Sequence, residues 1–587
     1  MKTTSFVRVL TALVLGISLL AAACAPQAQP PEPQPAAPSA PEAPAAPSEQ
    51  PAPSEGGGGT VVLLIPEEPP TLNLYLTNAS VIEQTADATS TTSLSDINEK
   101  GEFVPALAEA IPTVENGGLS ADYLTVTWKL KPGLKWSDGT PLTADDVKFT
   151  YEAISNPASG AVFAEGFDLI ESLETPDERT VVIHYRQPFT GYARQFAYGI
   201  FPRHAAGTPE TMTTWEWNRK PVSAGPFVVS EWKAGESITM ERNPYYYETG
   251  KPYLERLIFR VVPESAAQTA MMKTGEAHVH LWPAENEAEY NQLLEGIAAQ
   301  KLVPGIWNTA IDFNLSMPFD KQLGAEPPHP ILGDVRVRRA ISHAIDYKTL
   351  AYDVIQNVDV STSPFAYGWY QCDIPRVYDY DPEKARTLLE EAGWVMGSDG
   401  IRVAKGAKYA KDGTRLSLEL LSYTWEVMQK AQEFLAENLK EVGVELRIQA
   451  IDQAVMFGSM ADGSPILLGD FDLSLFDRGF SIEPHGYIYR RYASDQIPSE
   501  DDPSKDNFMR WVNAEADAAI QEAGSTFDFA KRQQAYCRLG KAIVEDVPQI
   551  YLFLFKDGYG FSNKLSGYTL NTWGSMTWDV QNWKLAE

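Results

Sequence analysis

The sequence predicts an α/β protein whose folded body divides into more than one domain or lobe. The chain has 587 residues, 44% of them hydrophobic, so the part after residue 59 can bury a large core. Patterns typical of strands and of helices alternate along this whole part. Helix patterns end at glycine and strand patterns follow, which is the order expected for layers of helices on a sheet.

The first clear strand pattern covers residues 124–131. Apolar residues alternate there with threonine and lysine, which gives the segment one apolar and one polar face. This period of two is typical of a half-buried strand. Pro132 and Gly133 then turn the chain, and Asp138 with Gly139 makes a second turn.

A helix is predicted directly after these turns. Thr143 and Asp146 have the spacing of a capping box, in which each residue's side chain bonds the backbone N–H of the other. The residues expected on its apolar face are Val147, Phe149, Tyr151 and Ile154.

Two further helices are marked by their first residues. Asp334 is a suitable N-cap for a helix whose apolar residues recur at helical spacing. Asp381 followed by Pro382 opens the next, which stops at Gly393. Each of these signals lies within one helical turn of the helix end that it marks, so it locates that end without reference to the rest of the fold.

A helix, a glycine and a strand follow one another between residues 425 and 450. The helix covers about 425–442 and carries apolar residues on one side. Gly443 ends it, and residues 444–450 alternate as a strand. This unit is the clearest local evidence for α/β layering.

Residues 1–23 have the features of a signal peptide. Two basic residues precede an apolar run that is too short to span a membrane comfortably, which takes roughly 20 apolar residues. Small residues then precede Cys24, a pattern that resembles the lipobox of bacterial lipoproteins, although Ala21 stands where that pattern usually has leucine. The resemblance implies cleavage after Ala23, acylation of Cys24 and anchoring of the protein to a membrane.

Residues 24–59 are predicted to be a spacer behind this anchor. Proline and alanine alternate with polar residues and the segment ends in four glycines, so it has nothing with which to form a core. Where extended, it would reach on the order of 100 Å at about 3.1 Å per residue. A folded body could therefore stand well away from a bilayer.

Composition limits the partners. The net charge of −30 and the isoelectric point near 4.7 argue against nucleic acid, whose phosphates require clustered lysine and arginine. Beyond Cys24 the chain has two cysteines, Cys372 and Cys537. Outside the cytoplasm they can form a disulfide, but two separately buried thiols are an equal alternative, because Cys537 lies in a helix pattern.

The sequence contains no convincing catalytic or cofactor motif. There is no phosphate-binding loop, dinucleotide fingerprint or nucleophile elbow, and His278 with His280 lacks a third metal ligand nearby. We therefore expect neither a cofactor nor a metal, and we do not expect an enzyme.

A long series of segments resembles the extracellular solute-binding proteins, family 5, the oligopeptide and dipeptide receptors of ABC importers. The most specific is WKLKPGLKWSDGTPLTADDV at 128–147. The others follow in the family's order at 225–227, 231–232, 241–246, 250–254, 334–341, 344–346, 380–385 and 392–394. Together they cover nearly the whole chain from residue 60.

This resemblance implies a two-lobed, periplasmic-binding-protein-like α/β fold, of type II and cluster C, with an additional inserted subdomain. By analogy, lobe I comprises residues 60–100, 221–310 and 553–587. The inserted subdomain comprises 101–220 and lobe II 311–552. The signature segment reads as strand, turn and helix cap, so we expect it to be scaffold.

The resemblance also implies where a ligand would bind. Peptide-binding members have a Gly-Trp-x-x-Asp stretch, whose carboxylate pairs with the α-amino group of the peptide. The matching stretch here is Gly479-Phe480-Ser481-Ile482-Glu483, in which the aromatic residue and the acid are kept but changed. We therefore expect Gly479, Phe480 and Glu483 at the ligand, with Glu483 holding an ammonium group.

Other candidate ligand residues are less closely matched. Many relatives have Asp-Trp after the strand at 444–450, where this chain has Asp452-Gln453. Relatives that bind oligosaccharides use stacked aromatics, for which Trp369, Tyr370 and Trp425 are the candidates, although each has an equal chance of serving as core.

Three functions follow from these expectations. The first is a receptor that captures short peptides in an interlobe cleft and delivers them to the membrane subunits of an ABC importer. The second is the same receptor for an oligosaccharide or another organic solute, and the third, remote one is a secreted hydrolase. For the first two we expect a monomer outside the cytoplasm, lipid-anchored through Cys24 at the outer face of the cell membrane or in the periplasm, with no nucleic-acid partner.

Overall fold

The computed structural model describes residues 58–586, apart from 78, 88–90, 317–327, 362, 366, 375–377, 461, 500, 501, 503 and 504. The signal-peptide prediction, Cys24 and nearly all of the predicted spacer therefore lie outside the described residues. Within the described part, no helix has the length and apolar character needed to cross a membrane.

An eleven-stranded sheet runs through the protein. Ten of its strands lie in this order: β16 (Glu445–Ile451), β15 (Ser417–Tyr423), β17 (Leu473–Gly479), β11 (Ala298–Phe313), β18 (Gln549–Ser562), β10 (Val279–Leu281), β1 (Thr60–Ile65), β9 (Arg256–Val261), β8 (Ser237–Arg242) and β7 (Phe227–Lys233). The short β12 (Val358–Val360) pairs with β18.

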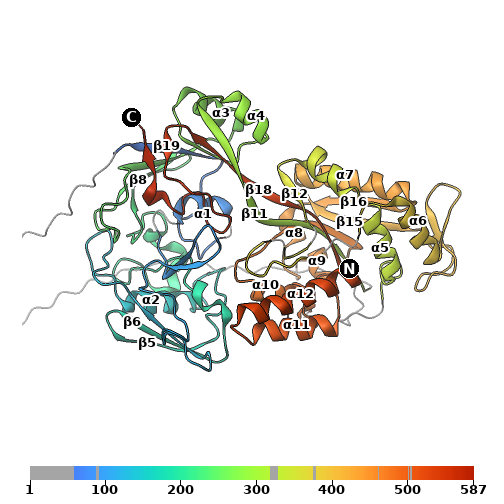
Figure 1. The fold of residues 1–587 in the computed structure, drawn as a ribbon, viewed down its shortest axis with the longest axis horizontal. Coiled ribbons are helices and arrows are strands. Elements are labelled where there is room, and N and C mark those ends of the chain that lie inside the picture. Colours follow the sequence, from blue (N-terminus) through green and yellow to red (C-terminus); the bar gives the residue numbers. More distant parts are fainter. Residues whose placement is uncertain are drawn as a thin grey trace, which may run out of the picture. The chain divides into compact units, whose positions relative to one another are not determined.

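The two longest strands, β11 and β18, connect the two halves of this sheet (Figure 1). They pair antiparallel along most of their length, with a register shift between Pro304 and Asn308. The first part of β11 pairs with the end of β18 whose other side pairs with β10, and the last part of β11 pairs with β17. Positions 310 and 553, where the sequence analysis divides the lobes, lie within these two strands.

Smaller sheets complete the strand structure. A separate three-stranded sheet has the order β4 (Thr125–Lys129), β6 (Thr180–Tyr185) and β5 (Ile170–Asp177). Three pairs are β2 (Ser95–Ile97) with β3 (Phe103–Pro105), β13 (Trp394–Met396) with β14 (Arg402–Ala404), and β19 (Leu565–Ser566) with β20 (Lys584–Leu585).

Helices accompany the sheets throughout the described residues. The α-helices are α1 (Ser80–Ala86), α2 (Ala144–Ile154), α3 (Ser265–Thr274), α4 (Glu287–Leu293), α5 (Val335–His343), α6 (Pro382–Glu391), α7 (Glu426–Glu441), α8 (Gln453–Met456), α9 (Pro465–Leu468), α10 (His485–Tyr492), α11 (Ala514–Gly524) and α12 (Phe529–Asp546). Short helical turns are η1 (Thr190–Arg194), η2 (Pro209–Thr214), η3 (Glu216–Asn218), η4 (Thr349–Ile355), η5 (Ser494–Gln496) and η6 (Val580–Asn582).

The helix starts predicted from local signals are confirmed. Thr143 and Asp146 form both bonds of the capping box at α2. The carboxylate of Asp334 accepts the N–H of Arg336 at α5, and that of Asp381 caps α6. Each of these contacts joins residues within one turn, which is why sequence alone could predict them.

The strand predicted at 444–450 exists as β16, but its alternation does not produce a buried face. β16 is the last strand of the sheet, and Ile448 is 44% exposed. The preceding helix α7 does bury its predicted apolar side, where Met428, Leu435 and Leu439 are fully covered.

Apolar side chains form separate clusters. One contains residues between 311 and 553, packed on the β15–β17 half of the large sheet. A second contains residues between 75 and 224, around the three-stranded sheet and α2. A third joins residues 61–86, 227–303 and 559–583 around β1, β8 and β9.

Candidate functional site

Several predicted ligand residues lie at one edge of the large sheet. β15 runs parallel to both β16 and β17, so the carboxyl ends of these three strands meet at the same edge. Trp425, Gln453 and Gly479 lie at or just after those ends. In α/β sheets this edge is the usual place for ligands.

Exposed aromatic rings gather at this edge. Trp425 is 39% exposed, and its ring centroid lies 5.5 Å from that of Phe555 in β18. Trp307 of β11, which pairs with Gly479, is also 39% exposed, and Phe457 beside α8 is 40% exposed. Large aromatic surfaces left open at a strand edge are typical of ligand sites.

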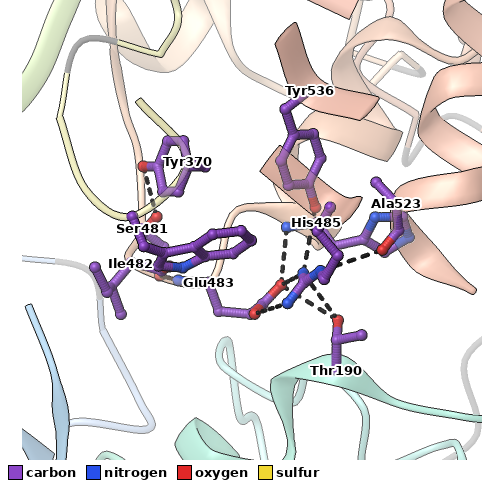
Figure 2. Close-up of polar contacts among 10 residues, drawn as sticks. Thr190, Tyr370, Ser481, Ile482, Glu483, His485, Ala523 and Tyr536 are labelled. Atoms are coloured by element: carbon purple, nitrogen blue, oxygen red, sulfur yellow. Dashed lines mark hydrogen bonds and ion pairs between the residues drawn. The ribbon is translucent and has the colours of Figure 1, made fainter. Parts of the chain in front are cut away.

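The segment Gly479–Glu483 begins at the last residue of β17, and two aromatic side chains hydrogen-bond to its backbone carbonyls. The indole N–H of Trp369 donates to the carbonyl of Ile482 at 2.7 Å, and the hydroxyl of Tyr370 donates to the carbonyl of Ser481 at 2.8 Å (Figure 2). Tyr370 is fully buried and Phe480 is 5% exposed. These residues fix the backbone of the loop that carries Glu483.

The carboxylate of Glu483 already has a cationic partner. Arg532 of α12 donates through Nη1 to Oε2 at 3.0 Å, and its Nη2 bonds Oε1 (Figure 2). The side chains of Arg532 and Glu483 are only 2% and 8% exposed. This is a buried, two-point ion pair.

A residue from a third segment of the chain hydrogen-bonds to both members of this ion pair. The hydroxyl of Thr190, in η1, donates to Oε1 of Glu483 at 3.2 Å and accepts from Nη2 of Arg532 at 3.3 Å (Figure 2). The backbone N–H of His485 also donates to Oε1, at 3.2 Å. Thr190 belongs to the predicted inserted subdomain and the other three residues to predicted lobe II, so the ion pair lies where these two parts of the chain meet.

The local environment keeps Arg532 charged. Burial lowers the pKa of its guanidinium, but the charge and hydrogen bonds of Glu483 outweigh this and raise the pKa above its usual value. The guanidinium also lies over the ring of Trp369, 4.7 Å from the centroid. By contrast, burial lowers the pKa of His485 to about 4, so this imidazole is neutral near pH 7.

The contacts leave limited room for a ligand at Glu483. A carboxylate has about four acceptor positions, and here three donors meet Oε1 and one meets Oε2. The position left is on Oε2. No local pattern in the sequence marks Arg532 or Thr190 as partners of Glu483, because each lies far along the chain from it.

Cys372 and Cys537 form a disulfide, which resolves the alternative left open by the sequence. It joins the segment that carries Trp369 and Tyr370 to α12, which carries Arg532. The covalent link therefore holds together two of the segments that surround Glu483.

Asp557 of β18 gives a testable pH dependence. Burial, followed by the nearby charge of Glu83, raises its pKa to about 6, and its carboxylate makes no hydrogen bond or ion pair with the described residues. The folded protein thus keeps a proton between about pH 4 and 6 that the unfolded chain releases, so stability falls as pH rises through this window.

We expect Asp557→Asn to remove this loss. At about 1.4 kcal/mol per pKa unit, the variant should exceed the natural protein by about 2–3 kcal/mol in free energy of unfolding at pH 7.5 and equal it at pH 4. Urea unfolding at several pH values measures this difference. Asp353→Asn, at an exposed position, is the control, and an Asp557→Asn curve parallel to that of the natural protein would refute the expectation.

Comparison with known proteins identifies the relatives of this chain. The model of the bacterial extracellular solute-binding proteins, family 5 Middle, matches residues 102–499. The oligopeptide-binding protein AppA of Bacillus subtilis is 26% identical over 509 residues, which are 84% of this chain and 86% of AppA.

Solved structures show the same fold. The structure of AppA in complex with a nonapeptide has a TM-score of 0.69 at 24% identity and covers 91% of this chain and all of AppA. The ABC transporter substrate binding protein CtaP of Listeria monocytogenes has a TM-score of 0.72 at 22% identity, covering 90% of this chain and all of CtaP. These likenesses confirm the predicted two-lobed α/β fold.

Proposed function

Because this chain belongs to the bacterial extracellular solute-binding proteins, family 5, we propose that it is the solute receptor of an ABC importer and captures short peptides. The observation that carries the proposal is the match over most of the chain, together with the peptide-binding names of the relatives. Members of this family are solute-binding proteins that act outside the cytoplasm. For this chain we propose in addition that it binds its ligand without converting it chemically.

The lobes and the inserted subdomain take the boundaries given by analogy above. Lobe I is 60–100, 221–310 and 553–587, the inserted subdomain 101–220 and lobe II 311–552. The peptide lies between the lobes, along the sheet edge that carries Trp307 and Trp425. The chain then works as a monomer that hands the peptide to the permease subunits.

Within this site, Glu483 holds the α-ammonium of the peptide through the acceptor position left on Oε2. Arg532 pairs with the carboxylate and fixes it in place, while Phe480, Gly479, Trp369 and Tyr370 fix its loop. Trp425 and Gln453 line the neighbouring strand ends. Because Arg532 already neutralises Glu483, the ammonium adds a hydrogen bond and charge attraction without forming the first ion pair.

A second candidate ligand is an oligosaccharide or another uncharged solute. The exposed rings of Trp307, Trp425 and Phe457 favour it, since flat aromatic surfaces stack on sugar rings as well as on peptides. A secreted hydrolase is the third and most remote candidate function.

Thermal unfolding separates these ligands. A pool of tri- to hexapeptides should raise the melting temperature of the protein, since a ligand that binds only the folded state stabilises it by about 2.7 kcal/mol at a hundredfold excess over Kd. A maltooligosaccharide mixture should leave the melting temperature unchanged. The reverse result would replace peptides by sugars as the ligand class.

The lipid anchor is a separate part of the proposal. Cys24 is acylated after removal of residues 1–23, and residues 24–59 keep the folded body away from the membrane. Labelling cells with an alkynyl fatty acid should mark the natural protein and not Cys24→Ser. Labelling of both to the same extent would show that the lipid is not attached to Cys24.

A further inference from the structure

A basic segment that starts at the end of β14, residues 404–413, has no role in the proposal above. Its sequence is AKGAKYAKDG, with three lysines and one aspartate, in a chain whose net charge is −30. We call this segment the lysine loop. A cluster of positive charge on so acidic a chain favours contact with an anionic partner, because the many acidic residues already provide solubility.

Alanine and lysine recur in the lysine loop at intervals of three residues. The alanines belong to the apolar cluster of residues between 311 and 553, or pack against it; they are Ala404, Ala407 and Ala410. The lysine that follows each alanine is exposed; these are Lys405, Lys408 and Lys411. The alanines therefore hold the loop on the core of predicted lobe II, while the lysines extend into solvent.

Hydrogen bonds within the lysine loop close it on itself. The backbone N–H of Gly413 donates to the carbonyl of Ala404 at 2.8 Å. The carboxylate of Asp412, the one acid of the loop, accepts the backbone N–H of Gly406 at 2.7 Å. Because the backbone is already fixed, the three lysines can bind a common partner with little further loss of backbone entropy.

The ammonium groups of these lysines are not neutralised by their neighbours. None of them makes a hydrogen bond or an ion pair with a residue that the structure describes, although Lys408 lies over the ring of Tyr409, with Nζ 4.7 Å from the centroid. The acids beside the loop are each paired with an arginine: Asp399 and Glu445 with Arg415, and Asp334 with Arg336. The positive charge of the loop is therefore available to a partner.

Tyr409 adds an aromatic ring to the same surface. Its side chain is 39% exposed, and a Cβ on Gly333 would lie 3.1 Å from its Cδ2, so the ring rests against the chain just before α5. Tyrosine is enriched where a membrane meets water, because its ring is apolar and its hydroxyl polar. The loop thus combines charges suited to lipid headgroups with a ring suited to the layer beneath them.

We propose that the lysine loop binds the anionic headgroups of the phospholipid surface to which the chain is anchored. The inference rests on the proposed lipid anchor, since a body tethered through Cys24 stays within reach of that surface. The net charge of −30 does not prevent the contact. At physiological ionic strength the Debye length is about 8 Å, so acids farther than this from the headgroups are largely screened.

The contact sets which side of the receptor rests on the membrane. Each lysine close to an anionic bilayer strengthens binding about fivefold, so three lysines suffice to orient a body that is already tethered but not to anchor a free one. A lipid surface is favoured over an acidic protein because the anchor keeps it close to every copy of the chain.

Lysine acetylation tests the contact residue by residue. The chain from Cys24 to Glu587 is coupled to a maleimide phospholipid through Cys24, the one cysteine outside the disulfide. It is then held on vesicles of phosphatidylcholine, or of phosphatidylcholine with about one third phosphatidylglycerol. Brief treatment with an acetylating ester, followed by peptide mass spectrometry, gives the reaction rate of each lysine.

The three loop lysines should react about three- to tenfold more slowly on the anionic vesicles than on the neutral ones. Salt at about 1 M should abolish this protection, because it shortens the Debye length to about 3 Å. Exposed lysines elsewhere in the chain should react equally on both kinds of vesicle; the controls are Lys100, Lys220 and Lys273.

Two triple variants with the same change in net charge give a second measurement. One replaces the three loop lysines by glutamine, and the other replaces the three control lysines. With Cys24→Ser in each protein, sedimentation with anionic vesicles at low salt should be about ten- to hundredfold weaker for the loop variant than for the control variant. Both variants should melt with the natural protein, since exposed lysines contribute little to stability.

Two results would overturn the inference. Equal acetylation of the loop lysines on neutral and anionic vesicles would exclude the lipid contact, whereas a failure of the anchor itself would appear as missing fatty-acid label at Cys24 in cells. Protection on native membranes that carry the importer, without protection on anionic vesicles, would replace the lipid by an acidic protein surface. The peptide function stands in either case.

Discussion

Glu483→Gln lowers the free energy of unfolding by about 3–5 kcal/mol, because it leaves the buried guanidinium of Arg532 without its counter-charge. Arg532→Met should cost a similar amount, since it leaves the carboxylate unpaired. The double variant should cost clearly less than the sum of the two, because it leaves no unpaired charge. Urea unfolding of all four proteins gives the coupling energy directly.

An exposed ion pair supplies the control for this cycle. Glu426 and Lys430 pair at 2.8 Å on α7 with 77% and 51% of their side chains exposed. Glu426→Gln should therefore leave the free energy of unfolding nearly unchanged. Strictly additive effects of Glu483→Gln and Arg532→Met would contradict the importance given to their pairing.

The same variant tests the ammonium site. Glu483→Gln should bind peptides with a free amino terminus about tenfold more weakly or worse, at about 1.4 kcal/mol per tenfold. N-acetylated peptides should bind both proteins equally weakly, since they carry no ammonium. Calorimetry measures both affinities at a temperature where the variant is folded.

Removing the disulfide should have the second large effect. Replacing both Cys372 and Cys537 by serine opens a cross-link between residues 165 apart and should lower the free energy of unfolding by about 2–5 kcal/mol. The loss arises mainly because the unfolded chain gains freedom. Weaker ligand binding should accompany it, since the link also holds the segment of Trp369 against α12.

Reductant provides the internal check. It should shift the unfolding curve of the natural protein towards that of the double serine variant and leave the variant itself unchanged. An identical curve for the natural protein with and without reductant, under conditions where alkylation shows the two thiols to be free, would contradict the stabilising role of the link.

Sequence reasoning succeeded where the physical cause is local. The caps at Thr143, Asp334 and Asp381 depend on side chains and backbone groups within one helical turn, so their spacing in the sequence is their spacing in space. The helix expected at 425–442 and the strand expected at 444–450 are observed as α7 and β16 for the same reason, because Gly443 between them is a local signal for the end of the helix.

It failed where the cause lies in the pairing of distant segments. Ile448 alternates as if half-buried, yet it is exposed because β16 has a strand on one side only. Arg532 is 49 residues from Glu483 and Thr190 is 293 residues from it, so no local pattern joins them. Trp307 also could not be distinguished from a core tryptophan by sequence alone. Its exposure follows from the pairing of β11 with β17, which puts Trp307 opposite Gly479 at the end of β17.

The most direct test of the central claim is a native mass spectrum of the purified protein after exposure to a mixture of peptides of two to nine residues and removal of unbound material. The proposed receptor should carry one intact peptide per chain, and denaturation should release that peptide unchanged for sequencing. A protein that emerges without peptide but retains a maltooligosaccharide, or that releases only cleaved peptides, would contradict the claim.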